Sequence, residues 1–263
     1  MSELAVGAHL PEILPVRDAA KVVWRGSTAH IGPVAAATPL QGALLNKTCC
    51  GLYLLYIGCV GLITKRMVPI MNTNLNRCLT EQIFAYQFDW RYPSTYGITL
   101  TDIDENPDKI AAIRRMVPYF FFDFIERTNG FFLSQAPIAD IGFVVNLTRH
   151  LCGEENRPTV DGWIQQMIKR LDEIAYCPIV VGPVLQDFPT RVEWEDVVRF
   201  IHGQPLPIEV LDMSLKVDRD RFRDSALAQL RSIDPKVNSL LRPEEELRAL
   251  GFDGVPYGTG AGR

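Results

Sequence analysis

Histidine and cysteine are the residues of this chain that could bind a transition metal, but their spacing does not favour a shared site. The chain has four histidines and six cysteines. Zinc sites usually draw on CxxC or HxxxH spacings, which bring two ligands together, and neither spacing occurs. His150 and Cys152 are two positions apart, which separates their side chains by about 200° around a helix. The adjacent Cys49 and Cys50 also point in two directions. We therefore expect no metal and no cofactor.

Two groups of carboxylates could act on a cation or as a general base. Asp102, Asp104 and Glu105 directly precede Pro107, where an Asn-Pro pair indicates the start of a helix. Acids are favoured at that positive helix end without any chemistry, and this is the interpretation we prefer. The second group, within residues 218–224, alternates with arginines and is typical of a solvent-exposed face of ion pairs.

Neither a nucleophile nor a phosphate loop is indicated. The chain has no GxSxG turn, and no serine lies in the sequence context of a catalytic triad. Cys152 or Cys177 could meet His202 in the fold, although nothing in the sequence supports this. The GTGAG segment at residues 258–262 resembles a fragment of a nucleotide loop, but no helix follows to hold a phosphate. These observations favour a non-catalytic protein.

Two aromatic clusters are the most distinctive local feature. One lies within residues 84–96 and the other within residues 119–132. Tyr, Trp and Arg dominate the energetics of protein interfaces, whereas packing in the core is the ordinary role of such residues. From these clusters we predict five partner-binding residues: Trp90, Arg91, Tyr92, Phe121 and Phe122.

The elements that must position these residues are predicted to be mostly helices. Apolar spacing, capping residues and proline or glycine stops indicate the following helices: 39–66, 74–88, 107–127 with a break at Pro118, 137–151, 160–175 capped by Thr159, 191–202, 221–233 and 243–250. Alternating apolar residues make residues 179–185 and 211–217 candidate strands. The expected fold is therefore mainly α, a multi-helix globular fold with at most two or three short strands.

The chain divides into three regions. Residues 1–38 form a weakly patterned arm that we expect to pack on the body, and residues 39–250 form a helical body. A weak sub-boundary is placed near residues 153–158, which are polar and end in proline. Residues 251–263 are rich in glycine and are predicted to be a flexible tail. Gly51, Gly58 and Gly61 are expected to permit close helix packing rather than to do chemistry.

Charge and hydropathy narrow the partners and the compartment. The net charge is −4 and the sequence pI is about 5.6. No run of basic residues is visible, so direct contact with nucleic acid is not expected. Residues 49–63 carry no charge but are too short to cross a bilayer, and they predict a buried helix rather than a membrane span. Cysteines in apolar runs and the lack of a signal peptide at the N-terminus predict a cytoplasmic protein.

Three functions remain after this weighing. The favoured hypothesis is a non-catalytic helical subunit or adaptor of a larger cytoplasmic assembly, which binds one or more proteins through the aromatic clusters. The first alternative is an enzyme whose site is assembled from scattered residues, namely Asp102, Asp104, His150 and His202. The second is a specific inhibitor or immunity-type protein that binds one partner.

Overall fold

The computed structural model describes residues 4–17, 39–44, 46–68, 73–94, 136–177 and 201–258. Within these residues the chain forms seven α-helices and no strand, which confirms the mainly α multi-helix fold. The helices are α1 (Pro39–Leu44), α2 (Cys49–Met67), α3 (Thr73–Tyr86), α5 (Ala136–Cys152), α6 (Arg157–Ile174), α8 (Arg219–Ser232) and α9 (Glu244–Ala249). The described residues also form five 3-10 turns: η1 (Val6–His9), η5 (Glu154–Asn156), η7 (Ile208–Leu211), η8 (Pro235–Val237) and η9 (Pro256–Gly258).

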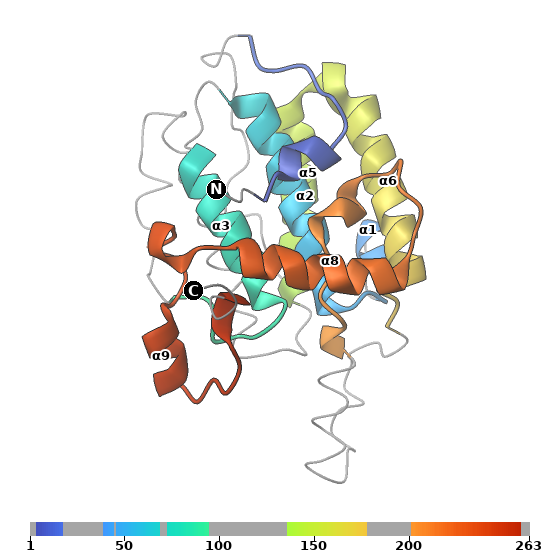
Figure 1. The fold of residues 1–263 in the computed structure, drawn as a ribbon. Helices are drawn as coiled ribbons and strands as arrows, with labels where there is room; N and C mark the ends of the chain where they lie inside the picture. The colour runs from blue at the N-terminus through green and yellow to red at the C-terminus, as the bar shows by residue number, and fades with distance from the viewer. Residues whose placement is uncertain are drawn as a thin grey trace.

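Helix α2 is the centre of the molecule. It is apolar on all sides along most of its length, so it is stable only where other elements cover it all round. It packs against α3, α5, α6 and η1, and Figure 1 shows it running between α3 and α6. Among the described residues it is the one helix long and apolar enough to cross a membrane, but 83% of its apolar window is buried by the rest of the chain. This confirms the buried helix predicted at residues 49–63.

The prediction of one continuous helix over residues 39–66 was wrong, because the chain breaks between α1 and α2. The backbone N–H of Thr48 donates to the Ala175 carbonyl (2.8 Å), and Cys177 N–H donates to the Asn46 carbonyl (2.9 Å). These bonds to a distant segment replace the bonds that would continue a helix. Thr48 then caps α2, since its side chain accepts a hydrogen bond from Gly51 N–H.

Helix α6 begins at Arg157, three residues before the predicted start at Val160. The residue before it, Asn156, is buried and joins the helix to the N-terminal segment. Its side-chain oxygen accepts from Leu14 N–H (2.8 Å), and its side-chain nitrogen donates to the Leu14 and Cys152 carbonyls. Next to it, Glu155 pairs with the largely buried Arg66 of α2 at 2.5 Å. Residues 153–157 therefore connect α5 and α6 to α2 and to the N-terminal segment.

Residues 211–217 do not form the predicted strand. They leave η7 as an irregular segment whose carbonyl groups bond to one side chain instead of to a neighbouring strand. The Arg170 guanidinium donates to the carbonyls of residues 210, 212, 213 and 215, at 2.5 to 3.3 Å. A single cation thus satisfies the backbone acceptors that a sheet would otherwise have paired.

The beginning of the predicted flexible tail is packed against the body. Tyr257 is 1% exposed, and its hydroxyl donates to the Arg242 carbonyl (3.1 Å). Tyr257 and Phe252 both contact the ring of Tyr92. These two aromatic side chains hold residues 251–258 in place despite the glycines. Several predicted segments lie wholly or partly outside the described residues: 18–38 of the arm, 107–127, 179–185, 191–200 and 259–263.

Candidate functional site

The turn that follows α3 presents Trp90 to solvent. Residues 87–92 leave the helix through consecutive turns, in which Gln87 N–H bonds to Phe84 and Tyr92 N–H bonds to Asp89. The Trp90 side chain is half exposed, at 51%, which is unusual for so large an apolar group. The prediction of Trp90 as a contact residue therefore falls on a side chain that a partner can reach.

Arg91 fixes this turn from both sides. Its guanidinium makes a two-pronged ion pair with Asp89, with Nε 2.8 Å from Oδ1 and Nη2 2.6 Å from Oδ2. The same Asp89 oxygen accepts from Arg91 N–H. The hydrogen bonds to Asp89 raise the pKa of the Arg91 guanidinium above its ordinary value. A bidentate pair of this kind restricts rotation of both side chains and makes the turn rigid.

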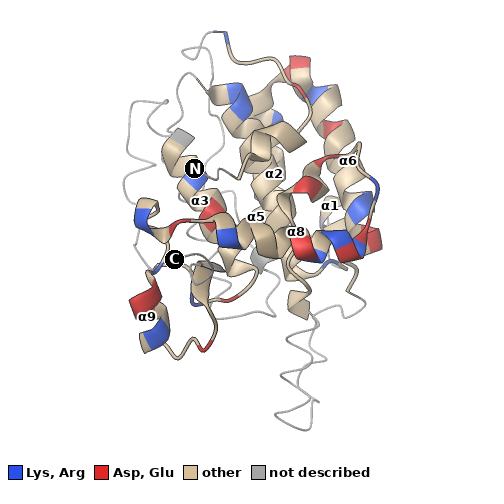
Figure 2. Ribbon diagram, viewed as in Figure 1, with Lys and Arg blue, Asp and Glu red and all other residues tan. Residues whose placement is uncertain are grey.

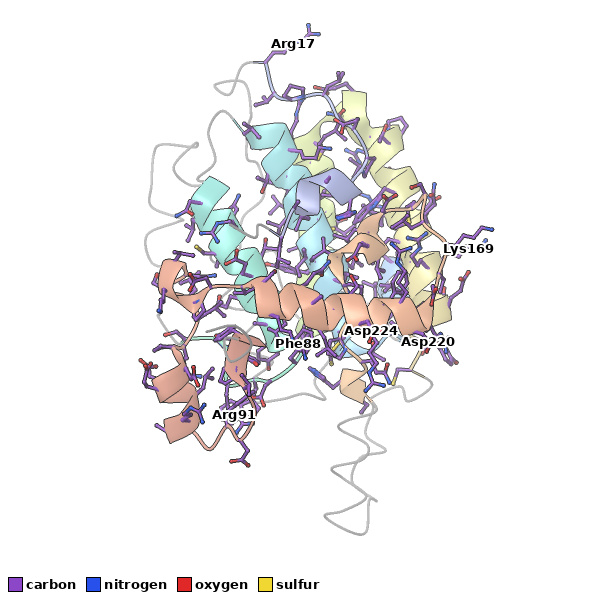
Figure 3. The ribbon with its side chains drawn as sticks, viewed as in Figure 1. Arg17, Phe88, Arg91, Lys169, Asp220 and Asp224 are labelled. Atoms are coloured by element: carbon purple, nitrogen blue, oxygen red, sulfur yellow. The ribbon has the colours of Figure 1, made fainter. Side chains whose placement is uncertain are left out.

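Arg91 also ties the turn to the C-terminal segment. Its Nη1 donates to the Gly251 carbonyl (2.7 Å) and more weakly to that of Leu250 (3.4 Å). Its guanidinium carbon lies 4.9 Å from the centre of the Phe252 ring, a cation–π contact. Figure 3 shows Arg91 alongside the segment that follows α9. Arg91 is therefore partly covered, and its role is to position the neighbouring surface.

Tyr92 lies inside the molecule rather than on this surface. It is 2% exposed and makes edge-on contacts with Phe252 and Tyr257, with ring centres 5.4 and 4.9 Å away. Burial raises the pKa of its hydroxyl to about 12. In this fold Tyr92 packs against Phe252 and Tyr257 in the interior, and a partner protein cannot reach it. The other two predicted contact residues, Phe121 and Phe122, lie outside the described residues.

The C-terminal segment that Arg91 contacts carries two exposed apolar side chains. Leu250 is 44% exposed and Val255 is 62% exposed. We define the Trp90 surface as the exposed Trp90 side chain together with the turn of residues 89–91 that carries it. The sequence did not indicate exposed contacts at Leu250 and Val255, because Leu250 ends a predicted helix and Val255 lies in the predicted flexible tail. The available signal was the pair Phe252 and Tyr257, which are large aromatic residues in an otherwise glycine-rich segment.

The histidines of the enzyme alternative occupy separate settings. His202 is mostly covered, and its Nε2 lies 2.8 Å from the Gln87 carbonyl, beneath the turn that carries Trp90. Desolvation by burial lowers the pKa of its imidazole. His150 is exposed near the end of α5. Asp102 and Asp104 lie outside the described residues.

A cysteine nucleophile is disfavoured by burial. Every cysteine is buried and free of disulfides. Desolvation raises the pKa of Cys152, the thiol nearest in sequence to His150, to about 12. The reactive form of cysteine is the thiolate, so a thiol with so high a pKa is inert at neutral pH. In the part of the chain that the structure describes, no group of three or more His, Cys, Asp or Glu side chains could hold a metal ion.

The comparisons with known proteins give no relative for this chain. No family model matches the sequence, and neither the curated proteins nor the solved structures gave a match. The case for a function therefore depends on the chemistry of the residues described above.

Proposed function

We propose that this chain is a non-catalytic helical subunit or adaptor of a cytoplasmic assembly, and that it binds a partner protein through the Trp90 surface. The observation that carries the proposal is the half-exposed indole of Trp90 on a turn held by the Asp89–Arg91 ion pair. Tryptophan is the residue most enriched among those that dominate binding energy, because its large surface is buried when it enters a pocket on the partner.

The rigidity of the turn strengthens this interpretation. A side chain that must be ordered on binding loses conformational freedom, which offsets part of the affinity gained. Here the backbone on both sides of Trp90 is already fixed, by the Asp89–Arg91 pair and by the bonds from Arg91 to residues 250 and 251. The surface is thus preorganised to insert one aromatic group into a partner.

The charges around the surface indicate the chemistry of the partner. Arg91, Arg242 and Arg248 each lie close to a carboxylate, namely Asp89, Glu246 and Glu244. Among the described residues, Glu245 and Asp253 make no ion pair within 4 Å, and both are exposed. Figure 2 shows acidic and basic residues interspersed over the helices rather than gathered into a basic face. We propose a protein partner whose apolar pocket has a basic rim.

The experiment is an affinity pull-down of the tagged chain from lysate of its own source cells, with quantitative mass spectrometry. The unmodified chain is compared with Trp90→Ala and with Leu14→Ala. Leu14 is about as exposed as Trp90, at 55%, but it lies elsewhere on the molecule. Its carbonyl accepts a hydrogen bond from Arg66, near the C-terminal end of α2. We expect Trp90→Ala to weaken binding of the recovered partner by roughly 30-fold, the loss typical of an interface residue worth about 2 kcal/mol. Leu14→Ala is expected to bind normally.

Melting temperature separates a lost contact from a lost fold. A half-exposed side chain contributes little to stability, so Trp90→Ala should change the free energy of unfolding by less than about 0.5 kcal/mol. Equal loss of a partner in both variants, or equal retention, would show that Trp90 does not carry the interaction. If the partner is one enzyme or toxin whose activity the chain blocks, the same surface would serve the inhibitor alternative.

A further inference from the structure

Away from the Trp90 surface, three segments that are distant in sequence enclose a cleft of about 450 Å³. They are the end of η1 with the residues that follow it, the first turns of α6, and the residues that follow η7. Figure 1 shows η1 against α2, and it also packs against η7. A cleft of this volume is in the range that encloses small organic ligands.

The wall formed by residues 211–214 is rigid. The Arg170 guanidinium bonds to four carbonyls of residues 210–215, as described above. From the same helix, α6, the indole N–H of Trp163 donates to the Leu211 carbonyl at 3.0 Å. A binding site needs polar groups held in fixed positions, and these bonds fix the backbone that carries Asp212.

Asp212 and His9 lie near each other in the lining of the cleft, although they come from distant parts of the chain. One oxygen of Asp212, Oδ1, accepts from the backbone N–H and hydroxyl of Ser214, at 2.9 and 2.6 Å. The other, Oδ2, lies 4.0 Å from Nδ1 of His9, too far for a hydrogen bond. That His9 nitrogen is buried and has no hydrogen-bond partner among the described residues. The Nδ1 atom of His9 is covered by its neighbours, so a ligand in the cleft would meet the Asp212 carboxylate, whose side chain is 29% exposed, rather than this nitrogen.

The charge of the cleft selects for a cation. Among the described residues, Asp212 is the one carboxylate that lines it, and no lysine or arginine does. The Ser214 hydrogen bonds lower the pKa of Asp212, so the carboxylate is charged at neutral pH. The N-terminus of α6 also borders the cleft at Pro158 and Thr159 and has the opposite sign. Its effect equals only about half a charge, and Pro158 has no N–H to offer an anion.

We propose that this cleft binds a small molecule that carries a primary amine on an apolar body. The ammonium donates a hydrogen bond to the Asp212 carboxylate. Leu10, Pro11 and Met213 contact the apolar body. This site lies on other elements than the Trp90 surface and does not depend on the proposed protein partner.

The test uses three probes of nearly equal size: benzylamine, benzyl alcohol and benzoate. Each is titrated into the full chain, and the amide signals of residues 8–11 and 211–214 are followed by NMR. We expect benzylamine to bind at least tenfold more tightly than either of the others. This comparison is made in the unmodified protein and so does not require any variant to fold.

Two variants locate the effect. Asp212→Asn should reduce the affinity for benzylamine to that for benzyl alcohol, whereas Asp253→Asn removes the same charge from the C-terminal segment and should leave it unchanged. Equal affinity for the amine and the alcohol would overturn the proposal in favour of a neutral ligand, and tighter binding of benzoate would favour an anion. Absence of shifts in these residues with all three probes would show that the cleft is not a ligand site.

Discussion

At the scale of single residues, three glycines of α2 allow other segments to come very close to the helix axis. A Cβ atom at Gly51 would lie 2.6 Å from Cβ of Ala175, and one at Gly61 would lie 2.5 Å from the Leu10 side chain. At Gly58 it would lie 2.4 Å from the ring of Trp163. The expectation that these glycines permit close packing is confirmed. Gly58 and Gly61 also position Trp163 and Leu10, two of the residues that line the cleft described above.

Gly58→Ala is predicted to destabilise the protein by roughly 1–3 kcal/mol. The added methyl group would meet the rigid indole of Trp163 and a methyl of Leu211, at 2.4 to 3.0 Å, and neither can move without disturbing the core. Denaturation by urea, followed by circular dichroism, measures the change in free energy of unfolding.

Gly162→Ala is the matched control, because a Cβ there has no other atom within 4 Å. Gly162 lies inside α6, where alanine is the better helix former, so this variant should be more stable by about 0.5–1 kcal/mol. The same sign of change in both variants would contradict the packing argument, since the two substitutions are chemically identical and differ only in surroundings.

At the scale of elements, the N-terminus of α2 is set by a cap and by contacts with a distant segment. Thr48→Ala removes the side-chain acceptor for Gly51 N–H and should cost about 1 kcal/mol of unfolding free energy. Thr48→Ser keeps the hydroxyl and should restore most of that loss, as measured by urea midpoint. If serine is as unstable as alanine, the methyl group of Thr48, packed near Gly203, is what matters and the cap is not.

The sequence predicted helix boundaries accurately where residues within the helix or next to its ends determine them. Helices α3, α5, α8 and α9 begin and end within two residues of the predicted positions, because apolar spacing and stop residues are properties of the segment alone. The errors share a physical cause. The break before α2, the irregular segment after η7 and the packed residues 251–258 are fixed by Ala175, Arg170 and Tyr92, which lie far away in sequence.

The candidate site shows the same division. Sequence composition indicated that the turn after α3 is rich in interface residues, but it did not distinguish Trp90 from Tyr92. The two have the same alternation, yet one is half exposed and the other is buried. The difference arises because Phe252 and Tyr257 cover Tyr92. Likewise, His9 and Asp212 are 203 positions apart, and no local pattern relates them.

At the scale of the whole molecule, the buried thiols couple stability to pH. Desolvation raises the pKa of Cys49, Cys59 and Cys152 from 9.0 to about 12, and it also raises that of Cys50. In the unfolded chain these thiols lose their protons near pH 9, whereas in the folded chain they keep them. The stabilisation is therefore complete below pH 9 and is lost as pH rises from about 9 to 12.

The urea midpoint should be constant between pH 7 and 8 and should fall above pH 9. Each buried thiol contributes up to about 1.4 kcal/mol per pH unit in this range, because the unfolded state binds one proton fewer. Measurements are made with a reducing agent to prevent disulfides. Cys152→Ala removes one titrating group, so its midpoint should fall less steeply with pH even if the variant is less stable at pH 7. A slope that is the same in both proteins would show that Cys152 ionises without unfolding, and hence that α5 opens to solvent independently of the rest of the core.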